Sequence, residues 1–380
     1  MRDRTDPSAI RILHVVNSMA RAGLETWLMN VMRRIDRERF RFDFCTATDR
    51  ECDYDEEIRA LGGTIIPCVW NHNILRFNHR FSRILREGRY DVVHAHAYGF
   101  AGVVLRAAAG NGVRHRFAHL HTTGDGKHPT LPRRVYRGVM RHWVNRHATR
   151  ILGCAAGALD AFFPAGWKND PRMRVVYYGV DLRPFEAGVD REGVRRELEL
   201  TPETPLLIHV GSFTPQKNHR RLIEIFDAVR TLRGDVHLTL IGIGPLLDGV
   251  RRQVRAIGLE ERVHFLGSRS DVPRLMQAAD VMVMPSVREG MPVTMIEAGA
   301  AGLPIVITEM PGIREATEIG CEATLLALDR PNEVWANAVI EALDSPRPSP
   351  AEALSRMTES PFSSEVSART MEAIYHHDAG

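Results

Sequence analysis

The sequence predicts an α/β protein with two doubly wound parallel sheets. Apolar strand-like runs alternate with helical patterns along most of the 380 residues, and the alternation occurs twice. The segment between the two halves, 170–186, holds Gly179 and flanking prolines and resembles a connector. This length is enough for two domains with separate cores. We therefore expect a first domain at 1–178, a second at 179–360, and a final helix at 361–380 that packs back toward the first.

The first half alternates strand and helix without interruption. Short apolar runs mark its strands, and apolar residues at helical spacing mark its helices. The expected strands are 10–16, 40–46, 64–68, 91–94 and 114–120. The expected helices are 24–34, 54–61, 77–86, 99–109 and 132–146. This order favours a parallel sheet covered by helices.

The second half repeats the pattern. Its expected strands are 206–210, 237–241, 263–266, 281–284 and 305–308, with helices between them. A proline cluster after Pro346 precedes a final helix near 366–375. Ligands of open α/β sheets bind at the carboxyl ends of the strands, so two facing sheets would hold a ligand in the cleft between them.

Composition excludes several classes of protein. The apolar fraction of 44% and the charged fraction of 26% are those of a soluble globular protein, and no apolar run is long enough to span a membrane. Residues 1–9 carry Asp3 and Asp6 and do not resemble a signal peptide. The five scattered cysteines include no Cys-x-x-Cys pair, which favours reduced thiols in the cytoplasm.

Charge is divided unevenly between the halves. Residues 1–183 carry a net charge of +12 and the remainder −9. The basic half would favour an anionic acceptor or an anionic membrane surface. No nucleic-acid-binding motif is present.

Two glutamates carry the most specific signal. Glu289 follows an expected strand, and Glu297 lies eight residues later in a helix that Pro292 would begin. An ionised carboxylate can accept hydrogen bonds from two hydroxyl groups, as in a ribose diol. The N–H groups of Gly290 and Met291, just before the helix, would face a bound anion.

A loop with a lysine follows the strand 206–210. It reads Gly-Ser-Phe-Thr-Pro-Gln-Lys-Asn over 211–218, and Lys217 is one of only three lysines in a chain with 47 arginines. Alone, Lys217 could simply begin a helix, and the glutamates could be solvated surface charges. Together and after strands, the three side chains predict a site for a molecule with both phosphate and hydroxyl groups, such as a nucleotide sugar.

Two other patterns suggest metal ions. Asp53-Tyr54-Asp55 precedes a helix, where acidic residues are explained by the helix dipole. The pairs His94/His96 and His119/His121 could share a strand face and bind zinc, which keeps a zinc-dependent hydrolase as an alternative. No converging carboxylate or third histidine is evident, so we favour histidines that line a polar cleft.

Two helices are basic and amphipathic. In 77–86 and in 131–150, apolar residues at helical spacing are surrounded by arginines. Such helices can lie on anionic lipid, and a helix packed on a sheet gives the same periodicity. For 77–86 we favour packing; for 131–150 both interpretations stay open.

Taken together, these residues resemble the retaining glycosyltransferases of family 4, which have the GT-B fold, and within them the capsular and exopolysaccharide group. The resemblance covers nearly the whole chain. Its segments are 17–25, 91–96, 119–121, 177–185, 211–218, 242–245, 265–267 and 289–297.

The resemblance implies a role for each site residue. Glu297 would hold the ribose, Glu289 the hydroxyls of the donor sugar, and Lys217 the diphosphate. The other donor-binding residues would be Gly290, Met291, Ser212, Gly242, Gly244, Ser268 and Arg269. In the first domain, His121 would lie near the reacting sugar, and Gly23, His96 and His119 would line the facing surface.

The implied reaction moves a sugar from a nucleotide diphosphate, with UDP the expected nucleotide, to a hydroxyl of a glycan, lipid-linked sugar or small molecule. Configuration would be retained, and no cofactor or metal would be needed. A nucleotide-sugar epimerase or hydrolase of the same fold, or a binding protein without activity, remains an alternative. Three positions depart from the family pattern: Ser212 replaces an arginine, Ala22 a glycine and Tyr178 an asparagine.

Overall fold

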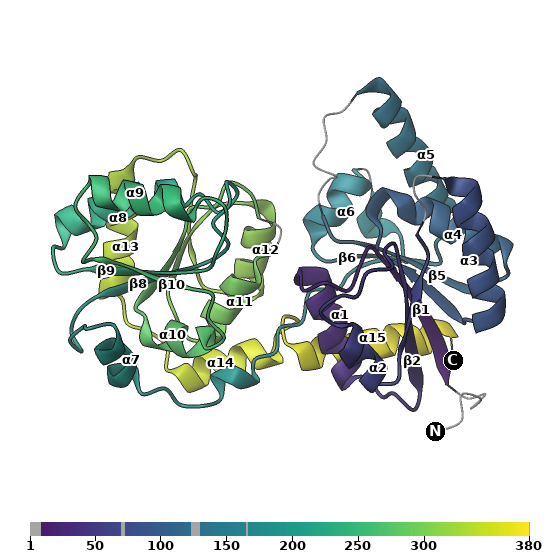
Figure 1. Ribbon diagram of the computed structural model, residues 1–380, viewed down its shortest axis with the longest axis horizontal. Helices are drawn as coiled ribbons and strands as arrows, with labels where there is room; N and C mark the ends of the chain where they lie inside the picture. Colours follow the sequence, from purple (N-terminus) through teal and green to yellow (C-terminus); the bar gives the residue numbers. More distant parts are fainter. Residues whose placement is uncertain (1–8, 70–72, 123–129, 165, 290, 380) are drawn as a thin grey trace. The chain divides into compact units, whose positions relative to one another are not determined.

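The computed structural model describes residues 9–69, 73–122, 130–164, 166–289 and 291–379 (Figure 1). The chain divides into two compact units. The N-terminal unit comprises Met1–Gly179 together with Ser364–Gly380, and the C-terminal unit comprises Val180–Ser363. Each unit contains one parallel sheet.

The sheet of the N-terminal unit has seven strands in the order β3-β2-β1-β4-β5-β6-β7. Its strands are β1 (Ile10–Val16), β2 (Phe40–Thr46), β3 (Thr64–Pro67), β4 (Val92–Ala95), β5 (His115–Leu120), β6 (Arg150–Gly153) and β7 (Met173–Val175). Its helices are α1 (Gly23–Arg34), α2 (Asp55–Ala60), α3 (Ile74–Gly88), α4 (Ala101–Gly110), α5 (Leu131–His147), α6 (Ala156–Phe162) and α15 (Ser364–Ala379).

Helices cover both faces of this sheet. One buried cluster joins the strands to α1, α2 and α15, and a second joins them to α3, α4, α5 and α6. Trp27 of α1 donates a 2.8 Å hydrogen bond from Nε1 to Ser367 Oγ of α15, which ties the C-terminal helix to the N-terminal unit. The ring of Tyr375 on α15 stacks on Phe117 of β5.

The C-terminal unit has six parallel strands in the order β10-β9-β8-β11-β12-β13. They are β8 (Leu206–Val210), β9 (His237–Ile241), β10 (Val263–Gly267), β11 (Val281–Met284), β12 (Ile305–Thr308) and β13 (Thr324–Leu326). Its helices are α7 (Arg191–Glu197), α8 (His219–Leu232), α9 (Leu247–Ala256), α10 (Val272–Ala278), α11 (Val293–Ala300), α12 (Pro311–Ile319), α13 (Asn332–Asp344) and α14 (Pro350–Glu359). The core formed by α8, α9 and α13 against the strands is rich in valine, leucine and isoleucine, as a sheet buried on both faces requires.

The structure corrects the expected connector. Residues 170–186 are not a single linker, because β7 extends the first sheet within that range. The chain passes from one unit to the other after Gly179, within that range and one residue from the expected boundary. Three strands were missed, namely β6, β7 and β13. Each has only three or four residues, and β7 and β13 are not fully buried, so they lack the continuous apolar run that marks equally short strands such as β11 and β12.

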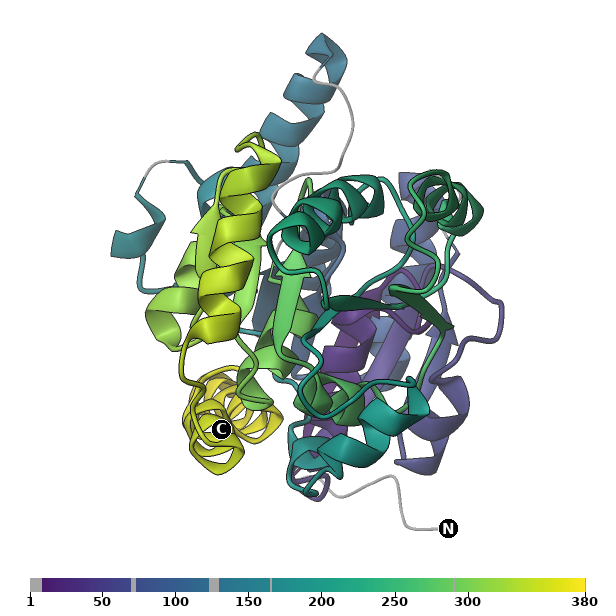
Figure 2. The same cartoon turned by 90° about the vertical axis from the view of Figure 1, so that its left-hand side faces the viewer.

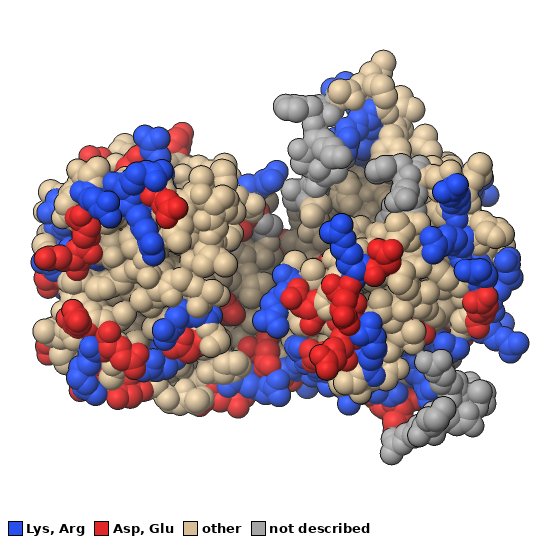
Figure 3. Space-filling view, viewed as in Figure 1, with Lys and Arg blue, Asp and Glu red and all other residues tan. Residues whose placement is uncertain are grey.

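The two basic helices differ. In α3, Phe77, Phe81 and Leu85 are buried, so the helix uses its apolar face for packing on the sheet, and its arginines form a basic surface (Figure 3). In α5, Met140 and Val144 are buried, whereas Leu131 and Val135 in the first two turns are 75% and 59% exposed. Both views show this end of α5 projecting beyond the rest of its unit (Figures 1 and 2).

None of the described helices is both long enough and apolar enough to cross a lipid bilayer.

Candidate functional site

Two loops at the carboxyl edge of the C-terminal sheet are fastened together. One follows β8 and the other follows the adjacent strand β11. The backbone N–H of Val287 donates to Gln216 O at 2.8 Å, and the Gln216 side chain donates to Arg288 O at the same distance. Asn218 Nδ2 donates to Pro285 O at 3.1 Å. These bonds hold residues 216–218 beside residues 285–288.

Lys217 and Glu289 form an ion pair between these loops. Lys217 Nζ donates to Glu289 Oε1 at 2.6 Å, and the two side chains are only 16% and 7% exposed. The backbone N–H of Glu289 points at Met310 Sδ, 3.0 Å away, which fixes the peptide before the helix. The structure thus joins two residues that the sequence placed on separate loops. Charged hydrogen bonds of this kind are short and strong, so the pair is a preorganised element of the site.

Glu297 lies in the second turn of α11, as expected from Pro292, which is the N-cap residue of that helix. Its side chain is half-buried and has no hydrogen-bond or ion-pair partner among the described residues. Burial raises the pKa of this carboxyl to about 7. A half-buried carboxylate without a partner is suited to accept hydrogen bonds from a ligand.

Gly242 and Gly244 allow the loop after β9 to approach the loop after β8. A Cβ at Gly242, where φ is 141°, would lie 2.1 Å from Gly211 O, and one at Gly244 would lie 2.7 Å from the backbone of Phe213. Hydrogen bonds then join the loops, because the N–H of Phe213 donates to Ile243 O at 3.0 Å. These glycines are therefore needed for contact between loops, a packing reason that the sequence did not reveal.

The remaining expected donor-binding residues surround this edge. Ser212 follows Gly211, and Ser268 and Arg269 follow β10, with both of the latter exposed. The guanidinium of Arg269 donates two 2.7 Å hydrogen bonds to Asp271, so that side chain is already paired. Met291 is half-buried, and Gly290 lies outside the described residues.

Two buried histidines support the lysine loop and were missed in the sequence. His209 Nδ1 lies 2.8 Å from Val283 O, which makes Nδ1 the protonated nitrogen. His219, the first residue of α8, stacks on Phe213 with ring centroids 3.9 Å apart. Burial lowers the pKa of His209 to about 4 and that of His219 to about 3, so both rings are neutral. His209 lies two residues before Gly211 and His219 directly follows Asn218, and neither position marks a buried histidine in the sequence.

In the N-terminal unit, histidines of adjacent strands form a chain of hydrogen bonds. His14 Nδ1 lies 3.0 Å from His96 Nε2, and His96 Nδ1 lies 2.8 Å from His121 Nε2. His121 Nδ1 lies 2.7 Å from the hydroxyl of Tyr178. Burial lowers the pKa of both His14 and His121 to about 3 and also lowers that of His96, so the three rings are neutral. Both ring nitrogens of His121 are thus engaged within the unit.

His94 and His119 are fully buried, which corrects the expectation that both His-x-His pairs line a polar cleft. The edge of Trp27 packs on His119, with ring centroids 5.0 Å apart. The structure also corrects the statement that no third histidine converges. His14, His94 and His96 could hold a metal ion, as could His96, His119 and His121, because their ligand atoms lie within 4.8 Å of one another in each set.

Gly23 and Tyr178 lie together beside His121. Gly23 is the first residue of α1, and a Cβ there would lie 3.8 Å from Cε2 of Tyr178. The ring of Tyr178 stacks on Trp27 at 5.5 Å. Burial raises the pKa of Tyr178, and Cys154 and Glu25 raise it further, so the hydroxyl is protonated. The sequence marked Tyr178 only as a departure from the family.

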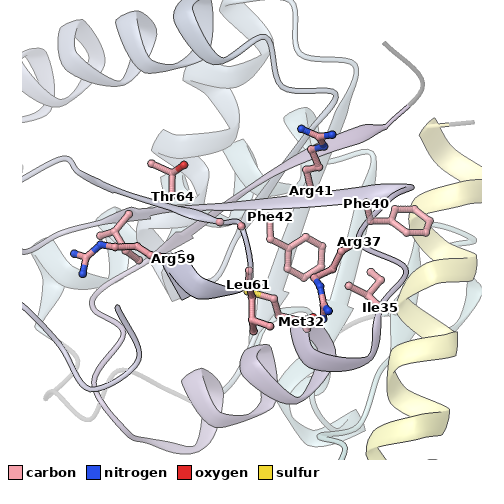
Figure 4. Close-up of a pocket in the computed structure, with 12 residues that line it drawn as sticks. Met32, Ile35, Arg37, Phe40, Arg41, Phe42, Arg59, Leu61 and Thr64 are labelled. Carbon is pink, nitrogen blue, oxygen red and sulfur yellow. Dashed lines mark hydrogen bonds between the residues drawn. The ribbon is translucent and has the colours of Figure 1, made fainter. Parts of the chain in front are cut away.

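One large cavity lies away from these residues. It has a volume of about 590 Å³ and is lined by α1, α2 and the first residues of β2 and β3, and Figure 4 shows it. This is the amino-terminal edge of the sheet, and none of the expected site residues lines it.

Known proteins match the chain in both units. A family model described as Glycosyltransferase Family 4 matches residues 21–183, and one described as Glycosyl transferases group 1 matches residues 204–345. The chain is 33% identical to EpsF of Bacillus subtilis, which is named for a glycosyltransferase activity, over 86% of both chains. It is 24% identical over 80% of its length to an Escherichia coli UDP-Gal:α-D-GlcNAc-diphosphoundecaprenol α-1,3-galactosyltransferase, and the match covers 81% of that protein.

A solved structure has the same fold. The Anabaena protein HepE in complex with UDP superposes with a TM-score of 0.79 at 20% identity, over 97% of this chain and 100% of that one. Two Rossmann-like parallel sheets with these neighbours define the GT-B fold. The chain belongs to the family 4 glycosyltransferases, and it is a glycosyltransferase.

Proposed function

We propose that the chain transfers a sugar from a UDP-sugar to a hydroxyl group of a glycan or a lipid-linked sugar, with retention of configuration. The observation that carries the proposal is the 2.6 Å ion pair of Lys217 and Glu289, with Glu297 unpaired on the helix that follows. A cation and two carboxylates meet the needs of a diphosphate and of sugar hydroxyls.

The names of relatives support the substrate classes. The Escherichia coli relative is named for UDP-Gal and for a diphosphoundecaprenol acceptor, and HepE was solved with UDP and with UDP-glucose. A UDP-sugar donor is therefore the first choice for this chain. The acceptor would carry a free sugar hydroxyl.

The chemical task is to stabilise the departing diphosphate. We infer that Lys217 moves its hydrogen bond, wholly or in part, from Glu289 to a phosphate oxygen when donor binds. The carboxylate of Glu289 is then available to hydroxyls of the sugar. Such charge stabilisation, fixed before the reaction, accounts for large rate effects in enzymes. The leaving phosphate would assist removal of the acceptor proton, and neither a divalent metal nor another cofactor is required for this step.

We also propose that the first turns of α5 contact an anionic membrane. Exposed Leu131 and Val135 accompany arginines at 133, 134 and 137 on a projecting helix, and no acidic residue lies between Leu131 and Arg150. Apolar side chains on a basic helix fit the interface of an anionic lipid layer. This would bring a lipid-linked acceptor to the N-terminal unit from the inner face of the membrane.

The direct test measures binding and turnover with the full chain. Calorimetry should detect UDP binding, and a panel of UDP-, GDP-, ADP- and TDP-sugars in a thermal-shift assay should give the largest increase in Tm for one UDP-sugar. Product analysis by NMR should show a retained anomeric configuration. A GDP- or ADP-sugar as sole ligand, or an inverted product, would overturn the corresponding part of the proposal.

A further inference from the structure

In the chain of histidines, each hydrogen bond between two rings contains one proton. The rings of His14 and His96 are buried, those of His96 and His121 bond at both nitrogens, and no carboxylate among the described residues is bonded to any of the three, so each carries one proton on one of its two nitrogens. The two bonds between the rings each join Nδ1 of one to Nε2 of the next. A hydrogen bond needs one proton and not two.

This rule couples the tautomers. If His14 carries its proton on Nδ1, His96 Nε2 must be bare, so His96 is protonated on Nδ1, and the same step then applies to His121. If His14 is protonated on Nε2, the reverse holds along the whole chain. All three rings therefore share one tautomer. The tautomer of His14 in the core therefore determines the tautomer of His121, which follows β5.

Tyr178 is the outer end of this chain. With all rings protonated on Nδ1, His121 donates to the tyrosine oxygen, and the Tyr178 O–H is left to donate elsewhere. With all rings protonated on Nε2, the hydroxyl donates to His121 and presents only lone pairs. The inner end, His14 Nε2, is buried without a hydrogen-bond partner among the described residues, so the chain can exchange partners only at Tyr178.

The position of Tyr178 suits contact with a substrate. Its ring is half-buried, stacked on Trp27 and next to Gly23, at the carboxyl edge of the sheet. Ligands of open α/β sheets bind at this edge. Stacking fixes the ring, and the tautomer of His121 decides whether the hydroxyl donates to His121 or keeps its proton for another acceptor.

We propose that Tyr178 is a substrate-contacting residue of the N-terminal unit, and that His14, His96 and His121 act as one tautomeric unit that sets its hydroxyl as donor or acceptor toward a substrate oxygen. The proposal rests on the proposed transfer reaction for the identity of the substrate. The oxygen belongs to an acceptor hydroxyl.

The alternative for this cluster is a bound metal ion. Both His triads include His96, whose two nitrogens already pair with other rings. Glu25, whose charge raises the pKa of Tyr178, has its own pKa raised by burial. A cation there would have to break a ring-to-ring bond. The hydrogen-bonded chain therefore explains more of the geometry than a metal does.

The tautomers can be measured without any enzyme assay. The full-length protein is labelled with ¹⁵N-histidine, and the ring nitrogens of His14, His96 and His121 are assigned by their loss in single His→Gln variants. Protonated and bare ring nitrogens have well-separated ¹⁵N shifts. We expect one and the same tautomer at all three positions. Mixed tautomers, or one equivalent of tightly bound Zn²⁺ in metal analysis of the purified protein, would overturn the coupled chain.

Kinetics test the contact with substrate. Tyr178→Phe removes the hydroxyl and keeps the ring on Trp27, so we expect at least a tenfold loss of kcat/KM with the thermal midpoint nearly unchanged. The loss should include a higher KM for the acceptor, and a change confined to KM for the donor would contradict the contact with an acceptor hydroxyl. The matched control is Tyr90→Phe, whose hydroxyl donates to Asp43 at 2.9 Å before β4, at the opposite edge of the sheet. Unchanged kinetics in Tyr178→Phe would overturn the contact, whereas inactivity of the parent protein with every sugar nucleotide would instead count against the proposed function.

Discussion

The ammonium group of Lys217 and the carboxylate of Glu289 hold each other at 2.6 Å across two loops that are 72 residues apart in sequence. Each residue was expected to bind a different part of one ligand. Their pairing means that these two charges neutralise each other before ligand arrives, and that neither residue can be changed without affecting the other.

Lys217→Ala should reduce kcat by about 100-fold or more, the usual effect of removing a group that stabilises developing charge. The variant also leaves Glu289 without its cation, so binding of UDP should weaken. Steady-state kinetics with saturating UDP-sugar gives the first value and calorimetry the second. Lys168→Ala, in the N-terminal unit, is the matched control and should behave like the parent. Normal turnover in Lys217→Ala would remove the lysine from the proposed mechanism.

Glu297 should make nucleotide binding depend on pH. Its folded-state pKa of about 7 lies above the ordinary value of about 4.3, and the ionised form is the better acceptor for a ribose diol. UDP should therefore bind more tightly as pH rises from 6 to 8. Glu297→Gln should remove this dependence and weaken binding about tenfold at pH 8, as loss of a charged hydrogen bond implies. Glu318→Gln, an exposed position, should keep the parent profile.

The same pKa sets a trend in stability. Because burial raises the pKa of Glu297, its protonated form contributes stability that is fully present below pH of about 4.3 and is lost as pH rises through about 7. Relative to the parent, Glu297→Gln should thus gain in free energy of unfolding between pH 5 and 8. Urea unfolding of both proteins at several pH values measures the difference. A constant difference would mean that the carboxyl is not perturbed.

The fold was largely predictable, because buried parallel strands appear in sequence as short apolar runs. Strands such as β1, β2, β8 and β12 lie at the expected residues. Proximity in space was much less predictable. Nothing in the sequence indicates that Gln216 fastens to Arg288, that His14 reaches His96, or that Tyr178 reaches His121, since each contact joins segments brought together only by sheet order. Phe81 of α3 is buried and cannot contact lipid, whereas the basic amphipathic sequence of 77–86 also suggested binding to an anionic membrane.

Gly242→Ala should be strongly destabilising. A methyl group there would lie 2.1 Å from Gly211 O, and the positive φ of 141° adds strain of about 1–3 kcal/mol. We expect a total loss of at least about 2 kcal/mol and weaker binding of UDP, because the displaced loop carries Ser212. Gly234→Ala, where no atom lies within 4 Å of the added methyl group, is the matched control. Equal urea midpoints for the two variants would contradict the close approach of the loops.

Asp280 should be the most sensitive acidic residue away from the site. It accepts from Arg195 at 2.6 Å and from the N–H of Leu206 at 2.7 Å, and it also pairs with Arg191. Asp280→Asn would leave the buried guanidinium of Arg195 without its carboxylate, a loss of about 3 kcal/mol. Asp344→Asn breaks only an exposed pair with Arg233 and should cost under about 1 kcal/mol. Chemical unfolding that ranks the two variants the other way would show the Asp280 cluster to be unimportant.

The membrane proposal predicts sedimentation with vesicles of anionic lipid but not with neutral ones. Leu131→Ser combined with Val135→Ser should reduce the bound fraction about tenfold, since these side chains would lose apolar contact with lipid. Leu232→Ser, which changes an exposed leucine on α8, should leave the bound fraction unchanged. A parent protein that stays in the supernatant with both lipids would exclude the proposed contact.

The two units are unequal in one respect. Residues 180–363 form one uninterrupted segment, whereas the N-terminal unit is assembled from two segments, with Trp27 bonded to Ser367 and His94 to Tyr375. A ribosome therefore completes the C-terminal unit before it has made the last helix of the N-terminal one. A protein truncated near residue 363 would retain an intact C-terminal unit while leaving α1 and β4 uncovered, and it should aggregate through that exposed apolar surface.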